Sequence, residues 1–165
     1  MVTLSGFQFR TEDGAQQAIH LIEKLQRQAL IQVQDAGIIT WPIASKKPKT
    51  KHLSHLAGVG ALGGAFWGTL FDLIFSVPLF GMATGAVTGV FAGSFGITPY
   101  FINSVRRKVT EGTSAVFLLA SGGMLDKIVL VTRSLPSFEL ISTNLSNEQE
   151  VALRAAFAEE VSARV

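Results

Sequence analysis

The stretch from Leu53 to Ile97, LSHLAGVGALGGAFWGTLFDLIFSVPLFGMATGAVTGVFAGSFGI, contains a single charged residue, Asp72. Glycine recurs in it at every fourth position, in two runs: Gly60, Gly64 and Gly68, then Gly81, Gly85, Gly89 and Gly93. Residues four apart share one face of a helix, so each run predicts a flat stripe against which another helix can pack at backbone distance. Each glycine inside a water-exposed helix costs up to about 1 kcal/mol relative to alanine. The two stripes therefore predict helix packing away from water.

The length of this stretch is typical of a helical hairpin in a membrane. Leu53–Phe75 has 23 residues and Leu79–Ile97 has 19, whereas a membrane-spanning helix needs roughly 17–25. Pro78 separates the two segments, and proline disfavours a continuous helix. We therefore expect two antiparallel helices joined by a very short tip.

Basic clusters flank the hairpin on both sides. They consist of Lys46, Lys47, Lys49 and Lys51 before it and Arg106, Arg107 and Lys108 after it. Positive residues concentrate on the cytoplasmic side of bacterial membranes, which predicts a membrane protein with both termini in the cytoplasm. The same side chains are candidates for contact with anionic lipid head groups.

Composition limits the remaining possibilities. The chain has 165 residues, 48% of them hydrophobic, and a formal net charge of +2, with a mean hydropathy of +0.38 and a pI near 9.2. Cysteine is absent from the sequence, which excludes disulfides, a thiol nucleophile and thiolate metal ligands. No basic region followed by an apolar run opens the chain, so we expect no cleaved signal peptide.

The segments on either side of the hairpin predict an α+β domain. Alternation and helical spacing favour strands at about 2–9, 31–44, 114–120 and 138–143, and helices at about 11–29, 100–109, 124–135 and 147–161. Two strand–helix–strand units around one four-stranded sheet predict a ferredoxin-like split βαβ arrangement. We expect three parts: residues 1–52 (first half and basic linker), 53–97 (hairpin) and 98–165 (short helix, second half and C-terminal helix).

Several short patterns resemble a known family when taken in order. They are Val33-Gln34-Asp35-Ala36, the glycine-rich hairpin, Ser114-Ala115-Val116-Phe117-Leu118, and Leu145-Ser146-Asn147-Glu148-Gln149-Glu150 before Leu153-Arg154. This order is similar to a bacterial family of predicted membrane proteins, catalogued as domain of unknown function 1269. The resemblance implies membrane association and a ferredoxin-like domain with a glycine-rich insertion. It implies no catalytic residues.

Few residues offer chemistry. Asp72 is either a carboxylate at the end of a helix near the membrane interface or a polar contact inside an oligomer. His52 and His55 would share a helix face, but no third ligand lies nearby in sequence, so we expect membrane-surface histidines and no metal site. Gly58, Gly60 and Gly63 match a dinucleotide-binding pattern, but they follow a lysine-rich linker where that motif needs a strand. We expect neither a cofactor nor a catalytic site.

The resulting hypothesis is a non-enzymatic, membrane-associated protein that assembles with copies of itself through the glycine stripes and has a scaffolding or membrane-organising role. Its partners would be itself and membrane lipids. Nucleic acid is not expected, because the lysine run lacks interleaved aromatic residues. Two alternatives remain: a soluble particle with the hairpins packed in its interior, and a pore lined by hairpins with Asp72 as a polar ring.

Overall fold

A computed structural model describes residues 2–58, 61–75, 94–135 and 137–163 of the chain. Its strands are β1 (Val2–Phe9), β2 (Asp35–Thr40), β3 (Lys49–His52), β4 (Ser114–Ser121) and β5 (Phe138–Leu145). Its α-helices are α1 (Gly14–Arg27), α2 (Gly64–Phe75), α4 (Pro99–Lys108), α5 (Gly122–Val131) and α6 (Asn147–Ala163). The strands form one five-stranded sheet in the order β3-β2-β4-β1-β5, and every neighbouring pair is antiparallel. The expected α+β class is confirmed.

Local sequence signals account for the starts of three helices. The Thr98 side chain accepts a hydrogen bond from the Phe101 backbone N–H at 3.2 Å, and Pro99 occupies the first turn of α4. Ser121 caps α5 in the same way. At α6 the expected capping box is present: Gln149 N–H donates to Ser146 Oγ at 3.2 Å, and Ser146 N–H donates to Gln149 Oε1 at 2.8 Å.

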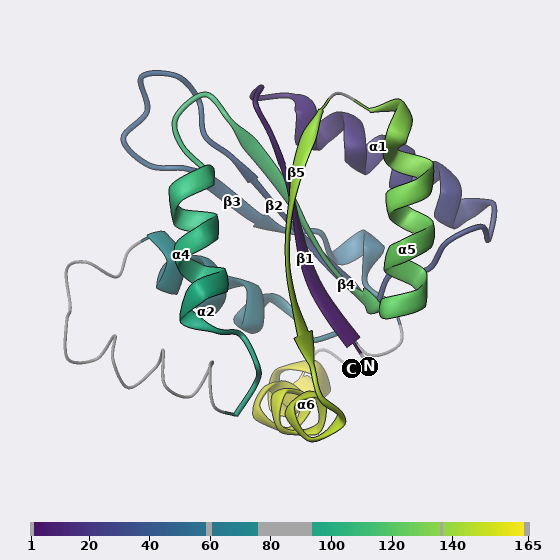
Figure 1. Ribbon diagram of the computed structural model, residues 1–165. Coiled ribbons are helices and arrows are strands. Elements are labelled where there is room, and N and C mark those ends of the chain that lie inside the picture. Colours follow the sequence, from purple (N-terminus) through teal and green to yellow (C-terminus); the bar gives the residue numbers. More distant parts are fainter. Residues whose placement is uncertain (1, 59–60, 76–93, 136, 164–165) are drawn as a thin grey trace.

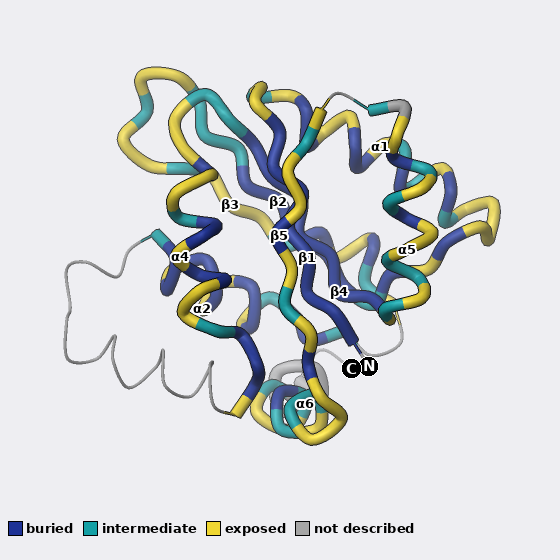
Figure 2. The backbone as a smooth tube through the Cα atoms, viewed as in Figure 1, coloured by how far each residue is buried: buried dark blue, intermediate teal, exposed yellow. Residues whose placement is uncertain are grey.

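Helices cover both faces of the sheet (Figure 1). Alternate residues of a strand point to opposite faces, so β4 contributes Val116 to one core and Phe117 to the other. The first core lies under α1 and α5, and the second under α2 and α4, with α6 at its end. Burial on both faces explains why every residue of β1 is buried, as the dark central strands of Figure 2 show.

The structure differs from the expected hairpin in its first half. Leu53–Phe75 is not one helix: Ser54–Leu56 is a short 3-10 helix, and α2 begins only at Gly64 and has 12 residues. The helix does not extend back from Gly64 because Gly63 has a φ of 89° and Ala57 is extended, and neither conformation is that of an α-helix. From Gly64 on, α2 buries large side chains against the sheet of its own chain. They are Phe66, Trp67, Leu70, Phe71, Leu73 and Ile74. Of the expected second helix, Leu79–Ile97, residues 79–93 lie outside the described residues, as does the expected tip at 76–78, and residues 94–97 form a turn and irregular backbone in place of a helix.

Three further boundaries depart from expectation. The strand expected at 31–44 is limited to Asp35–Thr40, and the expected basic linker contains the edge strand Lys49–His52. That strand pairs with β2 from Gly37↔His52 to Thr40↔Lys49. The helix expected at 124–135 begins at Gly122 and ends at Val131, followed by a 3-10 turn.

Within the described ranges, no helix has both the length and the apolarity needed to cross a membrane.

Candidate functional site

The start of α2 is held to the sheet by one buried carboxylate. Asp35, the first residue of β2, is completely buried. Its Oδ2 accepts hydrogen bonds from the backbone N–H groups of Leu62 at 2.8 Å and Gly63 at 3.2 Å, and its Oδ1 accepts one from Ala36 N–H at 2.9 Å. Carboxylate oxygens placed against the first N–H groups before a helix satisfy donors that the helix itself leaves unpaired. Asp35 thus fixes where the chain leaves the sheet and enters α2.

His52 completes this anchor. Its Nε2 lies 2.7 Å from Asp35 Oδ1, and its side chain is 13% exposed. Its ring stacks on Trp67 of α2, with ring centroids 6.4 Å apart and planes 15° from parallel. His52 of β3 therefore contacts both Asp35 of β2 and Trp67 of α2, and the three residues join these elements at one point. We call Asp35, His52 and Trp67 the α2 anchor.

The α2 anchor and its surroundings leave α2 with two contrasting faces. The inner face carries the large apolar side chains of the second core. The outer face consists of Ala65, Gly68, Thr69 and Asp72, all of which are exposed. Because these side chains are absent or small, the helix backbone lies close to the surface along this face.

The expected glycine stripe is only partly within the described residues. Gly64 is the first residue of α2 and is half-buried, and Gly68 lies in the middle of the outer face. A Cβ added at Gly68 would have no atom of the described residues within 4 Å, so no contact among those residues requires glycine there. Gly60, Gly81, Gly85, Gly89 and Gly93 lie outside the described residues.

Asp72 lies on the same outer face, one helical turn after Gly68. It is exposed in the last turn of α2. Both roles expected for it, a helix-end carboxylate near the membrane interface and a polar contact between copies, stay predictions.

The basic residues after the expected hairpin belong to α4, and they differ in their contacts and exposure. Arg106 reaches α2: its Nε donates to Ile74 O at 2.7 Å and its Nη2 donates to Leu73 O at 3.1 Å. Those carbonyls belong to the last turn of α2, where a cation is stabilised by the helix dipole. Arg107 and Lys108 are exposed, and Lys108 Nζ lies 3.2 Å from Glu139 Oε2.

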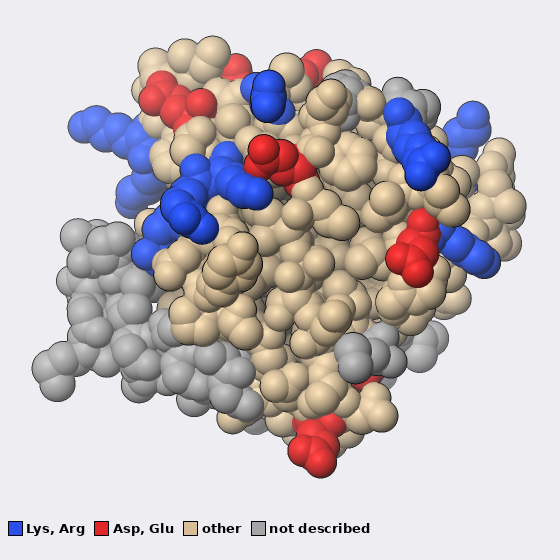
Figure 3. All heavy atoms as spheres, in the orientation of Figure 1, with Lys and Arg blue, Asp and Glu red and all other residues tan. Residues whose placement is uncertain are grey.

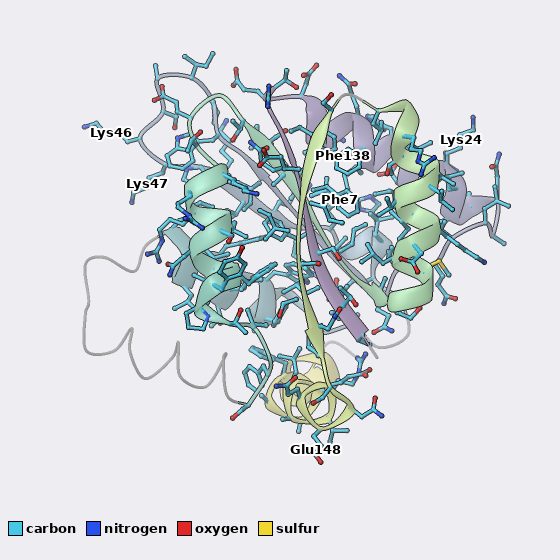
Figure 4. The ribbon with its side chains drawn as sticks, in the orientation of Figure 1. Phe7, Lys24, Lys46, Lys47, Phe138 and Glu148 are labelled. Carbon is cyan, nitrogen blue, oxygen red and sulfur yellow. The ribbon has the colours of Figure 1, made fainter. Side chains whose placement is uncertain are left out.

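The four lysines expected before the hairpin lie on and beside the edge strand β3. Lys46 and Lys47 are exposed in the β2–β3 loop, and Lys49 and Lys51 are exposed on the strand. Lys46 and Lys47 point away from the molecule on the side of α4 (Figure 4). Lys and Arg side chains gather on this side in Figure 3. The loop is joined to the segment after α4, because Gly112 N–H donates to Trp41 O at 2.7 Å.

The two histidines expected on one helix face occupy separate places. His52 belongs to the α2 anchor, whereas His55 pairs with Glu23 of α1 at 2.7 Å and is half-exposed. The described residues contain no group of three or more potential metal ligands.

The comparison with protein families gives one finding. The model of the family described as protein of unknown function (DUF1269) matches residues 61–158, which is more than half of the chain. The chain belongs to this family. The DUF1269 match begins just before α2 and ends within α6, so it includes α2 and α4 but not β1, α1, β2 or β3. No curated protein and no solved structure gives a significant match to the chain.

Sequence reasoning missed the α2 anchor. Asp35 stands in an otherwise uncharged run, Val33-Gln34-Asp35-Ala36-Gly37-Ile38-Ile39, ahead of a strand. A lone acidic residue at the start of an apolar strand is a signal for a buried, hydrogen-bonded carboxylate. Apart from Ala36, its partners are 17 to 28 positions away, and no local pattern identifies them.

Proposed function

We propose that this protein is a non-enzymatic scaffold that assembles with copies of itself through the outer face of α2. The observation that carries the proposal is the position of Gly68, exposed in the middle of a helix with open space where a side chain would be. A glycine there lowers helix stability by up to about 1 kcal/mol relative to alanine. Close packing of a second helix would offset that loss.

The two faces of α2 support this role. Its large side chains are already used in the second core, which leaves the outer face for contact with another molecule. A second α2 approaching the same face could pack at backbone distance, as the glycine stripe predicts. Asp72, on this face, would then lie at or beside the contact.

Substituting Gly68 tests the proposal. Gly68→Leu places a large side chain on the outer face, and it should lower the particle mass measured by light scattering during gel filtration. The fold should persist, because the added Cβ meets no atom within 4 Å and leucine is the better helix former. Gly123→Leu is the matched control, because Gly123 is also helical and also open.

The proposal predicts that only Gly68→Leu lowers the mass, with far-UV circular dichroism unchanged in both variants. Equal masses for wild type, Gly68→Leu and Gly123→Leu would contradict it. A monomeric wild type at all concentrations would contradict it as well.

Membrane association is a second candidate function, and the gathered basic side chains favour it. Arg106 binds the last turn of α2, so the cationic C-terminal end of α4 lies beside the end of α2 at Phe75. The lysines of the β2–β3 loop lie on the same side. We propose that this side contacts anionic lipid head groups, to which each lysine or arginine near the surface contributes about 1 kcal/mol. The membrane would then be reached from the cytoplasm, with both termini on that side.

Vesicle flotation tests this candidate. Wild type should float with vesicles containing phosphatidylserine but not with pure phosphatidylcholine, and added salt should weaken the binding. Lys46→Glu with Lys47→Glu should reduce flotation. Lys24→Glu with Lys127→Glu is the control with equal charge change, and Lys24 lies on the opposite side of the molecule (Figure 4). Equal losses in both pairs would indicate a response to net charge alone and contradict a lipid-facing side.

The two alternatives from the sequence make different predictions. A large particle without detergent and without flotation would favour the soluble assembly. Conductance in planar bilayers that Asp72→Leu abolishes would favour the pore.

We also propose that the sheet is a ferredoxin-like split βαβ fold with one added edge strand. The order β2-β4-β1-β5, with α1 and α5 packed on one face, supports this assignment.

A further inference from the structure

The two edges of the sheet are built differently. At one edge, β3 has four residues, and Lys49 and Lys51 are exposed on it. At the other edge, β5 has eight residues and carries one charged residue, Glu139. Short length and exposed lysines are the features by which natural sheets prevent an edge from pairing with another strand. β3 has these features, whereas β5 lacks them.

The β5 edge is regular and open. β5 pairs with β1 without a bulge along its whole length, from Phe9↔Phe138 to Val2↔Leu145. Among the described residues, the backbone of β5 has no hydrogen-bonded strand other than β1. Its outward N–H and C=O groups are therefore available to a further strand. Ser142 is exposed, and Leu140 is 41% exposed, which is high for a leucine in a sheet.

The surface along the middle of this edge is uncharged, whereas Arg10, Lys108 and Glu139 lie near its Phe138 end. The carboxylate of Glu139 lies 3.2 Å from Lys108 Nζ, so its charge is paired within the chain. The surface over the middle of β5 is free of acidic and basic side chains (Figure 3). A charged partner strand would find no opposite charge to pair with over the middle of β5, whereas a neutral strand could approach without repulsion.

We propose that β5 pairs antiparallel with β5 of a second copy of this chain. The two sheets would then join across a two-fold axis into one continuous sheet. A second copy matches the edge in length and in its lack of charge, and antiparallel pairing of a strand with itself satisfies both edges at once. Eight residues give a contact of about 27 Å at roughly 3.4 Å per residue.

This contact is separate from the one proposed for α2, because α2 covers a face of the sheet whereas β5 forms its edge. A chain with both contacts would form particles larger than a dimer. A chain with either contact alone would form dimers. The two proposals can therefore fail independently.

Ser142→Lys tests the β5 contact by giving this edge the protection that β3 already has. The particle mass measured by light scattering should fall at least two-fold relative to wild type. Thr50→Lys places the same side chain at an exposed position of the β3 edge, and it should leave the mass unchanged. In the Gly68→Leu background, Ser142→Lys should convert a dimer into a monomer.

A mass that Ser142→Lys leaves unchanged in both backgrounds would overturn the β5 proposal without affecting the α2 proposal. Hydrogen exchange on the unmodified chain gives a second measurement, which needs no variant to fold. Amides of residues 138–145 should exchange more slowly as protein concentration rises, whereas those of 49–52 should not change. Exchange of 138–145 that is independent of concentration would overturn the proposal.

Discussion

At the scale of single residues, Asp35 is the most important residue for the position of α2, although sequence patterns do not identify this role. It is fully buried, and its two oxygens accept three backbone hydrogen bonds and face His52. A buried carboxylate with this many partners is stabilising only while each partner remains in place. We therefore expect substitutions at the α2 anchor to loosen α2 from the sheet.

Asp35→Asn should lower the free energy of unfolding by about 3 kcal/mol, because the amide has one acceptor oxygen and turns an NH₂ group toward N–H donors. Urea unfolding followed by circular dichroism measures the change. His55→Gln is the control. His55 also pairs with a carboxylate, but it is 54% exposed, so its loss should change stability by less than about 1 kcal/mol. Equal effects would contradict the role assigned to Asp35.

Gly37 is a glycine that close packing does explain. A Cβ at this position of β2 would lie 2.8 Å from Trp67 Cε3 and 2.9 Å from Phe71 Cζ. Gly37→Ala should therefore destabilise the protein by about 2 kcal/mol, because two buried rings must shift. Gly123→Ala, where no atom lies within 4 Å, should leave stability unchanged or higher. Thermal unfolding of both variants checks the contrast, and a stable Gly37→Ala would show that α2 lies farther from the sheet.

At the scale of elements, α2 shows what the sequence could and could not predict. Periodicity and capping signals locate the strands β1, β2, β4 and β5 and the helices α1, α4 and α6 to within a few residues, because each has a clear local pattern. α2 was different. Apolar side chains pack equally well against lipid and against a sheet, so the apolar residues of α2 do not distinguish the two. The residues of its outer face are small, and Asp72 is the only charged one. Its amphipathic character was therefore hidden, and only the tertiary contacts identify its partner.

Edge strand β3 was missed for a related reason. Its residues Lys49–His52 carry no apolar alternation, and lysine is typical of linkers as well as of protected edges. The pairing with β2 is set by the tertiary structure and not by a local pattern. The α2 anchor, which depends on that pairing, could not be predicted without it.

Arg106 links α4 to the last turn of α2, so its loss should act on that element. Arg106→Met keeps the aliphatic stem and removes two hydrogen bonds to Leu73 O and Ile74 O. We expect amides of the last turn of α2 to exchange about ten-fold faster, which corresponds to about 1.4 kcal/mol. Arg107→Met is the control, because Arg107 is exposed and its one described hydrogen bond, to Ser104, is 3.5 Å long. Unchanged exchange in Arg106→Met would refute the capping role.

At the scale of the whole molecule, helices cover both faces of the sheet, and α2 belongs to the folded domain. Its apolar residues are buried within the chain, and its glycine-containing face points outward. Under the proposed functions, self-association would depend on the folded domain presenting that face, and contact with lipid would depend on the basic side. The two properties should separate: Gly68→Leu should change particle mass, and the lysine variants should change vesicle binding.

The most direct measurement of the central claim, that the outer face of α2 meets its counterpart in another copy, is a single-cysteine cross-link. The sequence contains no cysteine, so Ala65→Cys on the outer face of α2 and Gln16→Cys on the exposed side of α1 each introduce one thiol. After mild oxidation and non-reducing electrophoresis, we predict covalent dimers for Ala65→Cys and almost none for Gln16→Cys. Equal, low cross-linking in both variants would contradict the claim.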